Sequence, residues 1–101
     1  MARRLPSPDA DLQPLAADMA ALGLLVRNRR AHSQLRIDDA AAQVGVSTDV
    51  LSRLENGRAV SLDKVFKVLD GFGLTLLVMT KDEAANALET RPSRPGGSEG
   101  G

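Results

Sequence analysis

The stretch from Gly45 to Arg58 constrains the fold most, because it joins a glycine turn to a short helix with one apolar face. Gly45 has no Cβ and therefore permits a sharp turn. Ser47 is a residue type that caps helix N-termini by accepting a backbone N–H bond. Leu51 and Leu54 are three residues apart and so share one face of the helix that follows. The sequence predicts a turn and a short helix over this stretch.

The opposite face of this helix carries small, polar or cationic side chains, namely Thr48, Asp49, Ser52, Arg53 and Asn56. Such side chains can reach base edges in the major groove of DNA, and an arginine can hold guanine with two hydrogen bonds. We therefore interpret the helix as a candidate DNA-recognition helix, with Arg53 as the best candidate for reading a base. An ordinary exposed helix face is the alternative interpretation.

Three further segments carry apolar residues at helical spacing. Their apolar positions are Leu15, Met19, Leu22 and Val26 in the first, Ile37, Ala40, Ala41 and Val44 in the second, and Leu62, Val65, Phe66, Leu69 and Phe72 in the third. Two phenylalanines and no tryptophan or tyrosine indicate an aliphatic core, which suits short, closely packed helices. We expect an all-α domain in which the third segment, capped by Ser61 and stopped by Gly71 and Gly73, forms the centre of the core.

Residues 74–80 differ from everything before them, because they are aliphatic or β-branched and lack a helical polar face. We predict one strand here, and the chain offers no second strand candidate. An isolated strand leaves backbone groups unpaired, so the predicted partner is the same strand of a second copy, antiparallel across a two-fold axis. The dimerisation residues would be Leu74, Leu76 and Val78.

The predicted organisation is therefore a flexible N-terminal arm over residues 1–14, a helical domain over 15–73, a dimerisation strand over 74–80 and a mostly disordered tail over 81–101. Three prolines in the arm, and prolines and glycines in the tail, disfavour regular structure there. Within the tail, residues 82–90 could form a marginal helix.

Composition excludes several classes of function. Without cysteine and with only His32, the chain has no disulfides, no thiolate metal sites and no histidine cluster, so we expect no cofactor. No long apolar run indicates a signal peptide or a membrane span, and we expect a cytoplasmic protein with no membrane partner. Catalysis by His32 with nearby serines and aspartates is the weakest interpretation, since no nucleophile elbow, metal spacing or phosphate loop accompanies it.

The net charge of +0 argues mildly against nucleic acid, because phosphate contacts dominate affinity for DNA. The distribution of charge matters more, and the basic residues concentrate between Arg27 and Lys67. A basic face on a neutral protein and a protein-interaction module that has lost DNA binding both remain open on this ground.

Four short motifs occur together: Leu22-Gly23-x-x-Val26-Arg27-x-x-Arg30, Ala40-Ala41-x-x-Val44-Gly45-Val46-Ser47, Leu51-Ser52-Arg53-Leu54-Glu55-Asn56-Gly57 and Gly73-Leu74. Over residues 18–73 their joint spacing resembles the lambda-repressor-like helix-turn-helix regulators, often called the XRE family. The candidate strand directly after the helical domain further resembles HipB-type antitoxins, in which such strands from two subunits pair. The resemblance implies a compact four- to five-helix helix-turn-helix domain plus one C-terminal β-strand that pairs across a homodimer.

For function, the resemblance implies a sequence-specific repressor that binds an inverted-repeat operator in double-stranded DNA, and is then associated with the nucleoid. It further implies a type II antitoxin that autoregulates its operon and neutralises a HipA-like kinase toxin. A stand-alone XRE-family regulator without a toxin is the alternative.

The resemblance also assigns roles to individual residues. The base-reading positions are Thr48, Asp49, Ser52 and Arg53. The positions near the DNA backbone are Arg36, Ile37, Ser47, Asn56 and Arg58. The positions that hold the motif together are Ala41, Gly45, Val46, Leu51 and Leu54, with Arg30 and Glu55 as a partly buried ion bridge. The chain departs from the family pattern at Arg36 and Ile37, where a Ser or Thr cap and a phosphate-binding Gln are common.

Overall fold

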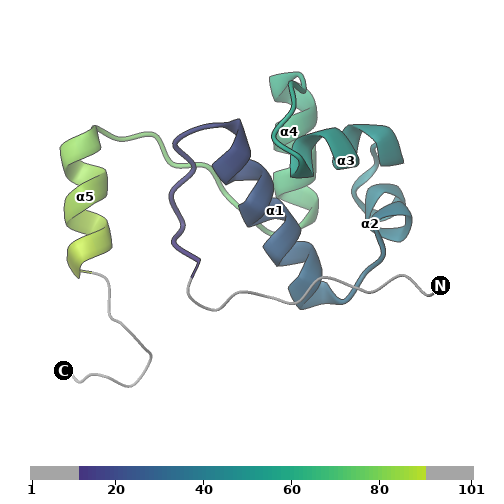
Figure 1. Cartoon of the computed structure of the whole chain (residues 1–101), viewed down its shortest axis with the longest axis horizontal. Coiled ribbons are helices and arrows are strands. Elements are labelled where there is room, and N and C mark those ends of the chain that lie inside the picture. Colours follow the sequence, from purple (N-terminus) through teal and green to yellow (C-terminus); the bar gives the residue numbers. More distant parts are fainter. Residues whose placement is uncertain (1–11, 91–101) are drawn as a thin grey trace.

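The computed structural model describes residues 12–90 of the chain, and within them it contains five α-helices and no β-strand (Figure 1). The helices are α1 (Met19–Ser33), α2 (Ile37–Val44), α3 (Thr48–Glu55), α4 (Leu62–Gly71) and α5 (Lys81–Thr90). Helices α1 to α4 pack into one body, whereas α5 stands apart from them at the end of residues 74–80. The all-α prediction is confirmed.

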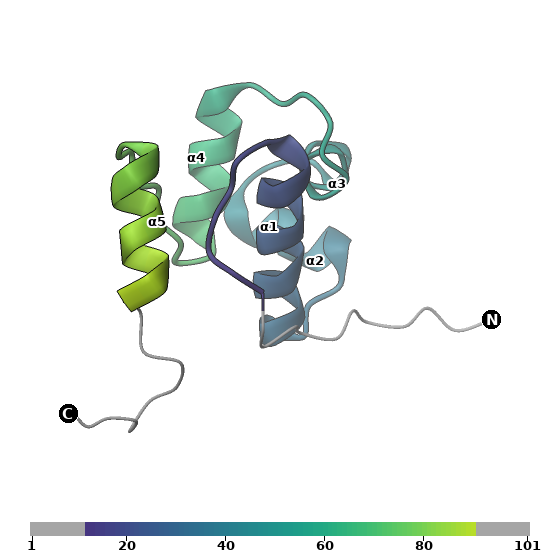
Figure 2. The ribbon, with the colours of Figure 1, turned by 60° about the vertical axis from the view of Figure 1, so that its left-hand side comes forward.

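Helix α1 begins four residues later than Leu15, where the apolar pattern begins. The side chain of Asp18 caps the helix by accepting the backbone N–H of Ala21 at 2.8 Å. Residues 12–18 instead run back alongside α1 (Figures 1 and 2), and Leu15 is half exposed. The expectation that Leu15 belongs to the helix and its core face is wrong, because a capping aspartate outweighs one more apolar residue at helical spacing.

The turn between α2 and α3 has the form that its sequence predicts. Gly45 ends α2 in a left-handed conformation, with φ of +86°, and its N–H donates to the Ala41 carbonyl at 2.9 Å. Ser47 precedes α3 and its hydroxyl accepts the N–H of Val50 at 3.1 Å. A glycine that permits the turn and a serine that caps the next helix therefore lie two residues apart.

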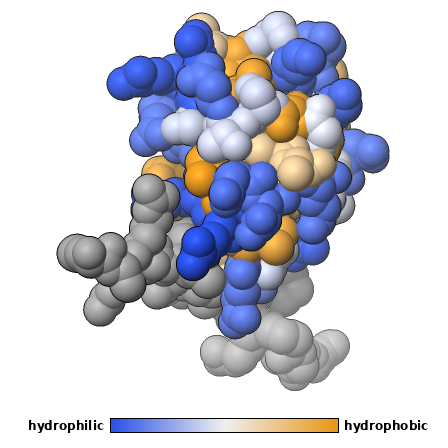
Figure 3. Space-filling view, turned by 90° about the vertical axis from the view of Figure 1, so that its right-hand side faces the viewer, coloured by the Kyte–Doolittle hydropathy of each residue, from blue (hydrophilic) through white to orange (hydrophobic). Residues whose placement is uncertain are grey.

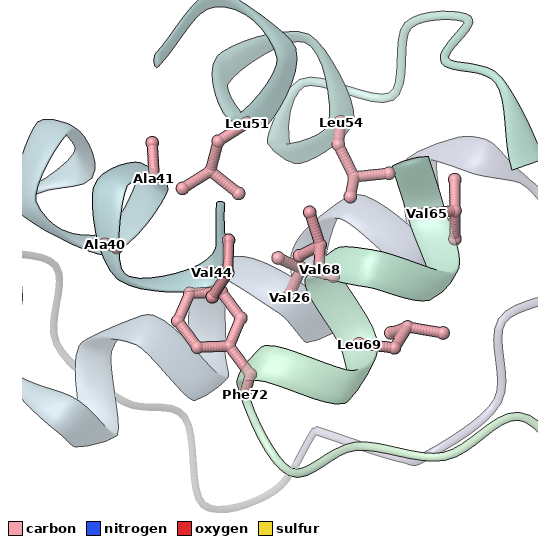
Figure 4. Close-up of a cluster of buried hydrophobic side chains, with 10 residues drawn as sticks. All are labelled: Val26, Ala40, Ala41, Val44, Leu51, Leu54, Val65, Val68, Leu69 and Phe72. Carbon is pink, nitrogen blue, oxygen red and sulfur yellow. The ribbon is translucent and has the colours of Figure 1, made fainter. Parts of the chain in front are cut away.

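The core is aliphatic except for one phenylalanine and draws on all four helices of the body (Figure 4). Its buried residues are Val26, Ala40, Ala41, Val44, Leu51, Leu54, Val65, Val68, Leu69 and Phe72. Partly buried side chains surround it, including Val46 beside the turn and Leu74 after α4. The small residues Ala40 and Ala41 keep α2 close to its neighbours.

Helix α4 buries a face that overlaps the predicted one but is shifted around the helix. Phe66 is 47 % exposed and Leu62 is 62 % exposed, whereas Val68 is fully buried. Residues 65, 68, 69 and 72 satisfy helical spacing as well as the predicted set does, so two overlapping faces fitted the same pattern. The segment does contribute to the core, but of its five predicted apolar positions only three are buried, namely Val65, Leu69 and Phe72.

The glycines of α4 have separate roles. A Cβ at Gly71 would lie 2.5 Å from Cγ1 of Val44, so this glycine permits close packing of α4 against α2. Gly73, with φ of +72°, is the left-handed residue that follows the helix. At the other end, Ser61 precedes the helix without a side-chain cap bond, and its hydroxyl instead bonds to Asp63 and lowers the pKa of that carboxyl group.

Residues 74–80 form no strand in the single chain. Leu74 packs against the core, and after it Leu77 and Val78 are largely exposed. Residues 82–90, which the sequence marks as a marginal helix, form most of α5. The rest of the predicted tail, and most of the predicted arm, lie outside the described residues. None of the helices in residues 12–90 is long and apolar enough to cross a membrane.

Candidate nucleic-acid interface

Helix α3 presents a polar face to solvent and an apolar face to the core. Thr48, Asp49, Arg53 and Asn56 are exposed and Ser52 is partly exposed. Leu51 and Leu54 are completely buried. The side of the molecule that carries α2 and α3 is largely hydrophilic (Figure 3). The candidate base-reading side chains therefore share an accessible surface on a helix that is anchored from behind.

Arg53 leans toward the loop that follows α3. Its Nη2 donates to the carbonyl oxygen of Ala59 at 3.1 Å. An arginine guanidinium carries five N–H donors, so this bond leaves the others to bind a base or a phosphate. The loop therefore orients Arg53 at the C-terminal end of α3, whereas Thr48 and Asp49 occupy the first turn.

Asn56 and Arg58 lie in the segment that ends α3. The Asn56 side chain donates from Nδ2 to the Ser52 carbonyl at 2.8 Å, and the same carbonyl also accepts the backbone N–H of Asn56 at 3.1 Å. Arg58 is exposed, and its backbone N–H donates to the Arg53 carbonyl at 2.8 Å. Asn56 thus has a structural role in the free protein, and Arg58 presents a cation beside the polar face.

The start of α2 presents both positive and negative side chains to a phosphate. Arg36 is the exposed N-cap residue and makes no side-chain cap bond. The side chain of Ile37 packs against the core, so only its backbone N–H faces the helix end. Asp38 and Asp39 follow in the first turn, and the Asp38 carboxylate accepts the N–H of Asp39 at 3.0 Å. Arg36 is the one side chain in this turn with the charge to attract a phosphate.

A buried ion pair fixes α3 to α1. Arg30 donates from Nε to Oε2 of Glu55 and from Nη2 to Oε1, both at 2.7 Å. The two side chains are only 8 % and 4 % exposed. Arg30 also donates from Nη1 to the Leu35 carbonyl at 3.0 Å, which the sequence did not indicate. This two-bond geometry holds the last residue of α3, and with it the polar face, in one position.

Close backbone packing reinforces the same junction. A Cβ at Gly23 would lie 2.4 Å from the carbonyl oxygen of Leu54 and 2.7 Å from that of Glu55. Glycine at this position therefore allows α1 to touch the end of α3. The motif Leu22-Gly23 and the pair of Arg30 with Glu55 serve the same contact.

His32 is the residue that the sequence raised as a candidate for catalysis. His32 is exposed on α1, and its Nδ1 lies 3.0 Å from the carbonyl oxygen of Asn28 on the same helix. Across residues 12–90, no group of three or more His, Asp or Glu side chains is arranged to hold a metal ion.

Comparison with known proteins agrees with this geometry. The pattern of a family described as "Helix-turn-helix domain" matches residues 21–78, which is 58 of the 101 residues. No curated protein matches the chain. The matched range contains α2, the Gly45 turn, α3 and α4, together with α1 apart from its first two residues. The chain therefore belongs to the helix-turn-helix domain family, whose motif marks it as a DNA-binding regulator.

Proposed function

We propose that the protein is a transcriptional repressor that binds DNA in a sequence-specific manner as a dimer. The observation that carries the proposal is the exposed polar face of α3, held in place by the buried pair of Arg30 with Glu55. A recognition surface must be accessible and rigid, and a recognition helix typically contacts base edges through its N-terminal residues. Thr48, Asp49 and Ser52 then face the bases, together with Arg53.

Phosphate contacts would come from the residues around α3. Ser47 keeps its hydroxyl hydrogen for a phosphate while its oxygen accepts from Val50. Arg36 and Arg58 supply exposed cations before α2 and after α3, and Asn56 lies beside Arg58. Charged contacts of this kind position a protein on DNA without reading its sequence. These cations share the surface with the exposed carboxylates of Asp38, Asp39 and Asp49, so binding in this proposal depends on individual arginine–phosphate contacts and not on net charge.

The dimer in this proposal forms through residues 74–80. Val78 is 91 % exposed and Leu77 is 72 % exposed, which is unusual for neighbouring aliphatic residues. Pairing with the same segment of a second copy would bury them and satisfy the backbone groups of both strands. Leu74, Leu76 and Val78 alternate along one face of such a strand. Two copies of α3 related by a two-fold axis would read half-sites about 34 Å apart.

Arg53 and Arg58 are expected to differ when each is replaced by alanine. Arg53→Ala should lose about 1–3 kcal/mol of binding free energy, concentrated at one base pair per half-site. Arg58→Ala should weaken binding equally on all sequences and reduce the salt slope by about one. A duplex selected from a random library and its single-base variants are titrated with each protein at several salt concentrations. These titrations give the loss of binding free energy on each sequence and the salt slope. Lys81→Ala on α5 is the control for loss of one cation, and equal, sequence-independent losses for Arg53 and Arg58 would remove Arg53 from base reading.

Leu77→Asp is expected to convert the dimer to a monomer. Leu77 is the central residue of 74–80, so antiparallel pairing across the axis would set two carboxylates directly opposite each other. Sedimentation equilibrium without DNA should give twice the chain mass of 10.7 kDa for the unmodified protein and the single chain mass for Leu77→Asp. Leu62→Asp makes the same change at an exposed leucine in the first turn of α4, where an acid is favourable, and should remain dimeric. A dimeric Leu77→Asp would place the interface elsewhere.

A finer proposal is that this dimer is the antitoxin of a HipA-like kinase toxin and represses the operon that encodes both. It is supported by the order of the chain, in which the exposed apolar segment 74–80 follows the helical domain directly. An overlapping kinase-like reading frame beside this gene, whose growth arrest is relieved by co-expression of this chain, is the expected result. If the gene has no such neighbour and the protein still binds its own promoter, a regulator without a toxin is favoured.

A further inference from the structure

Arg29 joins α1 to the end of α4. Its Nε donates to the carbonyl oxygen of Phe72 at 3.0 Å, a contact between residues 43 apart in sequence. Phe72 is the C-cap residue of α4, where carbonyl oxygens lack partners within the helix and where a positive charge is favourable. Arg29, although exposed, therefore adds a side-chain bond at the point where the chain leaves the helical body.

The two residues after Phe72 are also constrained. The N–H of Gly73 donates to the Asp70 carbonyl at 3.1 Å, and φ of Gly73 is +72°. The N–H of Leu74 donates to the Leu69 carbonyl at 2.8 Å, and the Leu74 side chain packs against the core. The direction of the chain is thus set just before the exposed residues from Leu76 onward.

Arg29 and Arg30 are consecutive residues of α1 with different partners. Arg30 holds Glu55 at the end of α3, and Arg29 holds Phe72 where the chain departs toward 74–80. Helix α1 is therefore the rigid piece that relates the polar face of α3 to the predicted dimerisation strand. A change in the direction in which residues 74–80 leave α4 would move α3 relative to the two-fold axis. The two copies of α3 would then shift relative to each other by twice that movement.

We propose that Arg29 is a positioning residue that sets which half-site spacing the dimer accepts. This inference rests on the proposed function, since it requires two copies joined through 74–80. Inserting one base pair between half-sites moves them about 3.4 Å along the duplex and rotates one relative to the other by about a tenth of a turn. A dimer in which residues 74–80 leave α4 in a fixed direction tolerates such an insertion poorly. Without the Arg29 contact only the Gly73 and Leu74 contacts hold that direction, so the dimer adapts more easily.

The experiment uses the full chain and a set of duplexes. The best inverted repeat is selected from a random duplex library with the unmodified protein, and one or two base pairs are then inserted or removed at its centre. Dissociation constants are measured for the unmodified protein and for Arg29→Ala, Arg29→Lys and Arg27→Ala. Arg27 and Arg29 are both exposed on α1, and Arg27→Ala removes the same charge without removing the bond to Phe72. Comparing spacings within one variant cancels any uniform effect of lost charge.

The unmodified protein and Arg27→Ala should bind about tenfold more weakly when the spacing changes by one base pair. To fit the new spacing they must break the bond from Arg29 to Phe72, and losing one hydrogen bond to a charged group costs about this factor. Arg29→Ala should bind all these spacings within about threefold, while its mass remains that of a dimer. Arg29→Lys, which can still donate one bond to Phe72, should fall between them, and it decides the question if Arg29→Ala does not fold.

Failure of this inference is distinguishable from failure of the proposed function. If the unmodified protein binds no duplex, or binds only as a monomer, the proposed function fails. If the unmodified dimer discriminates between spacings and Arg29→Ala discriminates equally well, the dimer stands and the role of Arg29 is refuted. Equal binding of all spacings by the unmodified dimer would also refute it.

Discussion

Glu55→Ala is expected to lower the free energy of unfolding by about 3–5 kcal/mol, because it leaves the Arg30 guanidinium buried without its partner. Both bonds of the pair are 2.7 Å long, and Glu55 is only 4 % exposed. The remaining bond from Arg30 to the Leu35 carbonyl cannot neutralise the charge. Urea or guanidinium unfolding, followed by far-UV circular dichroism, measures the loss.

Two further variants separate the broken pair from other effects. Glu89→Ala removes a carboxylate from an exposed position of α5 and should change stability by less than about 0.5 kcal/mol. The double variant Arg30→Met with Glu55→Leu removes both charges and should be more stable than Glu55→Ala, since replacing a buried pair by apolar residues is often neutral. A loss below about 1 kcal/mol for Glu55→Ala would mean that the pair does not hold α3.

Leu51→Ala and Leu62→Ala make the same chemical change at positions that both fit the apolar pattern. Leu51 is completely buried beneath the recognition face, whereas Leu62 is 62 % exposed. Leu51→Ala should cost about 2–5 kcal/mol, because it removes buried methyl groups and leaves a cavity. Leu62→Ala should stay within about 0.5 kcal/mol of the unmodified protein. Thermal or chemical unfolding of the two variants side by side gives the difference.

The comparison also tests which face α4 buries. Equal losses at the two leucines would mean that α4 is rotated so that Leu62 and Phe66 enter the core. A large loss at Leu51 alone agrees with a core formed by Val65, Val68, Leu69 and Phe72.

Local signals in the sequence were sufficient for the turn and for α3. Gly45, Ser47, Leu51 and Leu54 each act within a few residues of their own position, so they predict a sharp turn, a cap and a buried face, and the structure has all three. Helix α1 and α4 show the limit of the same reasoning. Apolar spacing did not reveal where the cap at Asp18 starts α1, nor which of two overlapping faces of α4 meets the other helices.

Contacts between distant residues were predictable only where a family pattern supplied them. The pair of Arg30 with Glu55 followed from the resemblance, and the structure contains it. The bonds from Arg29 to Phe72 and from Arg53 to Ala59 had no such guide, because a main-chain carbonyl is present at every residue and leaves no mark in the sequence. The residues proposed to contact DNA and the strand-mediated dimer stay predictions, since they concern partners beyond a single chain.

The central claim is that two copies of α3 read an inverted repeat across a two-fold axis, and a hydroxyl-radical footprint tests it most directly. The duplex is the one that the unmodified protein selects from a random library. The predicted result is two protected regions related by two-fold symmetry, with centres about 34 Å, or one helical turn, apart. A single asymmetric protected region, or protection that is independent of sequence, would contradict the claim.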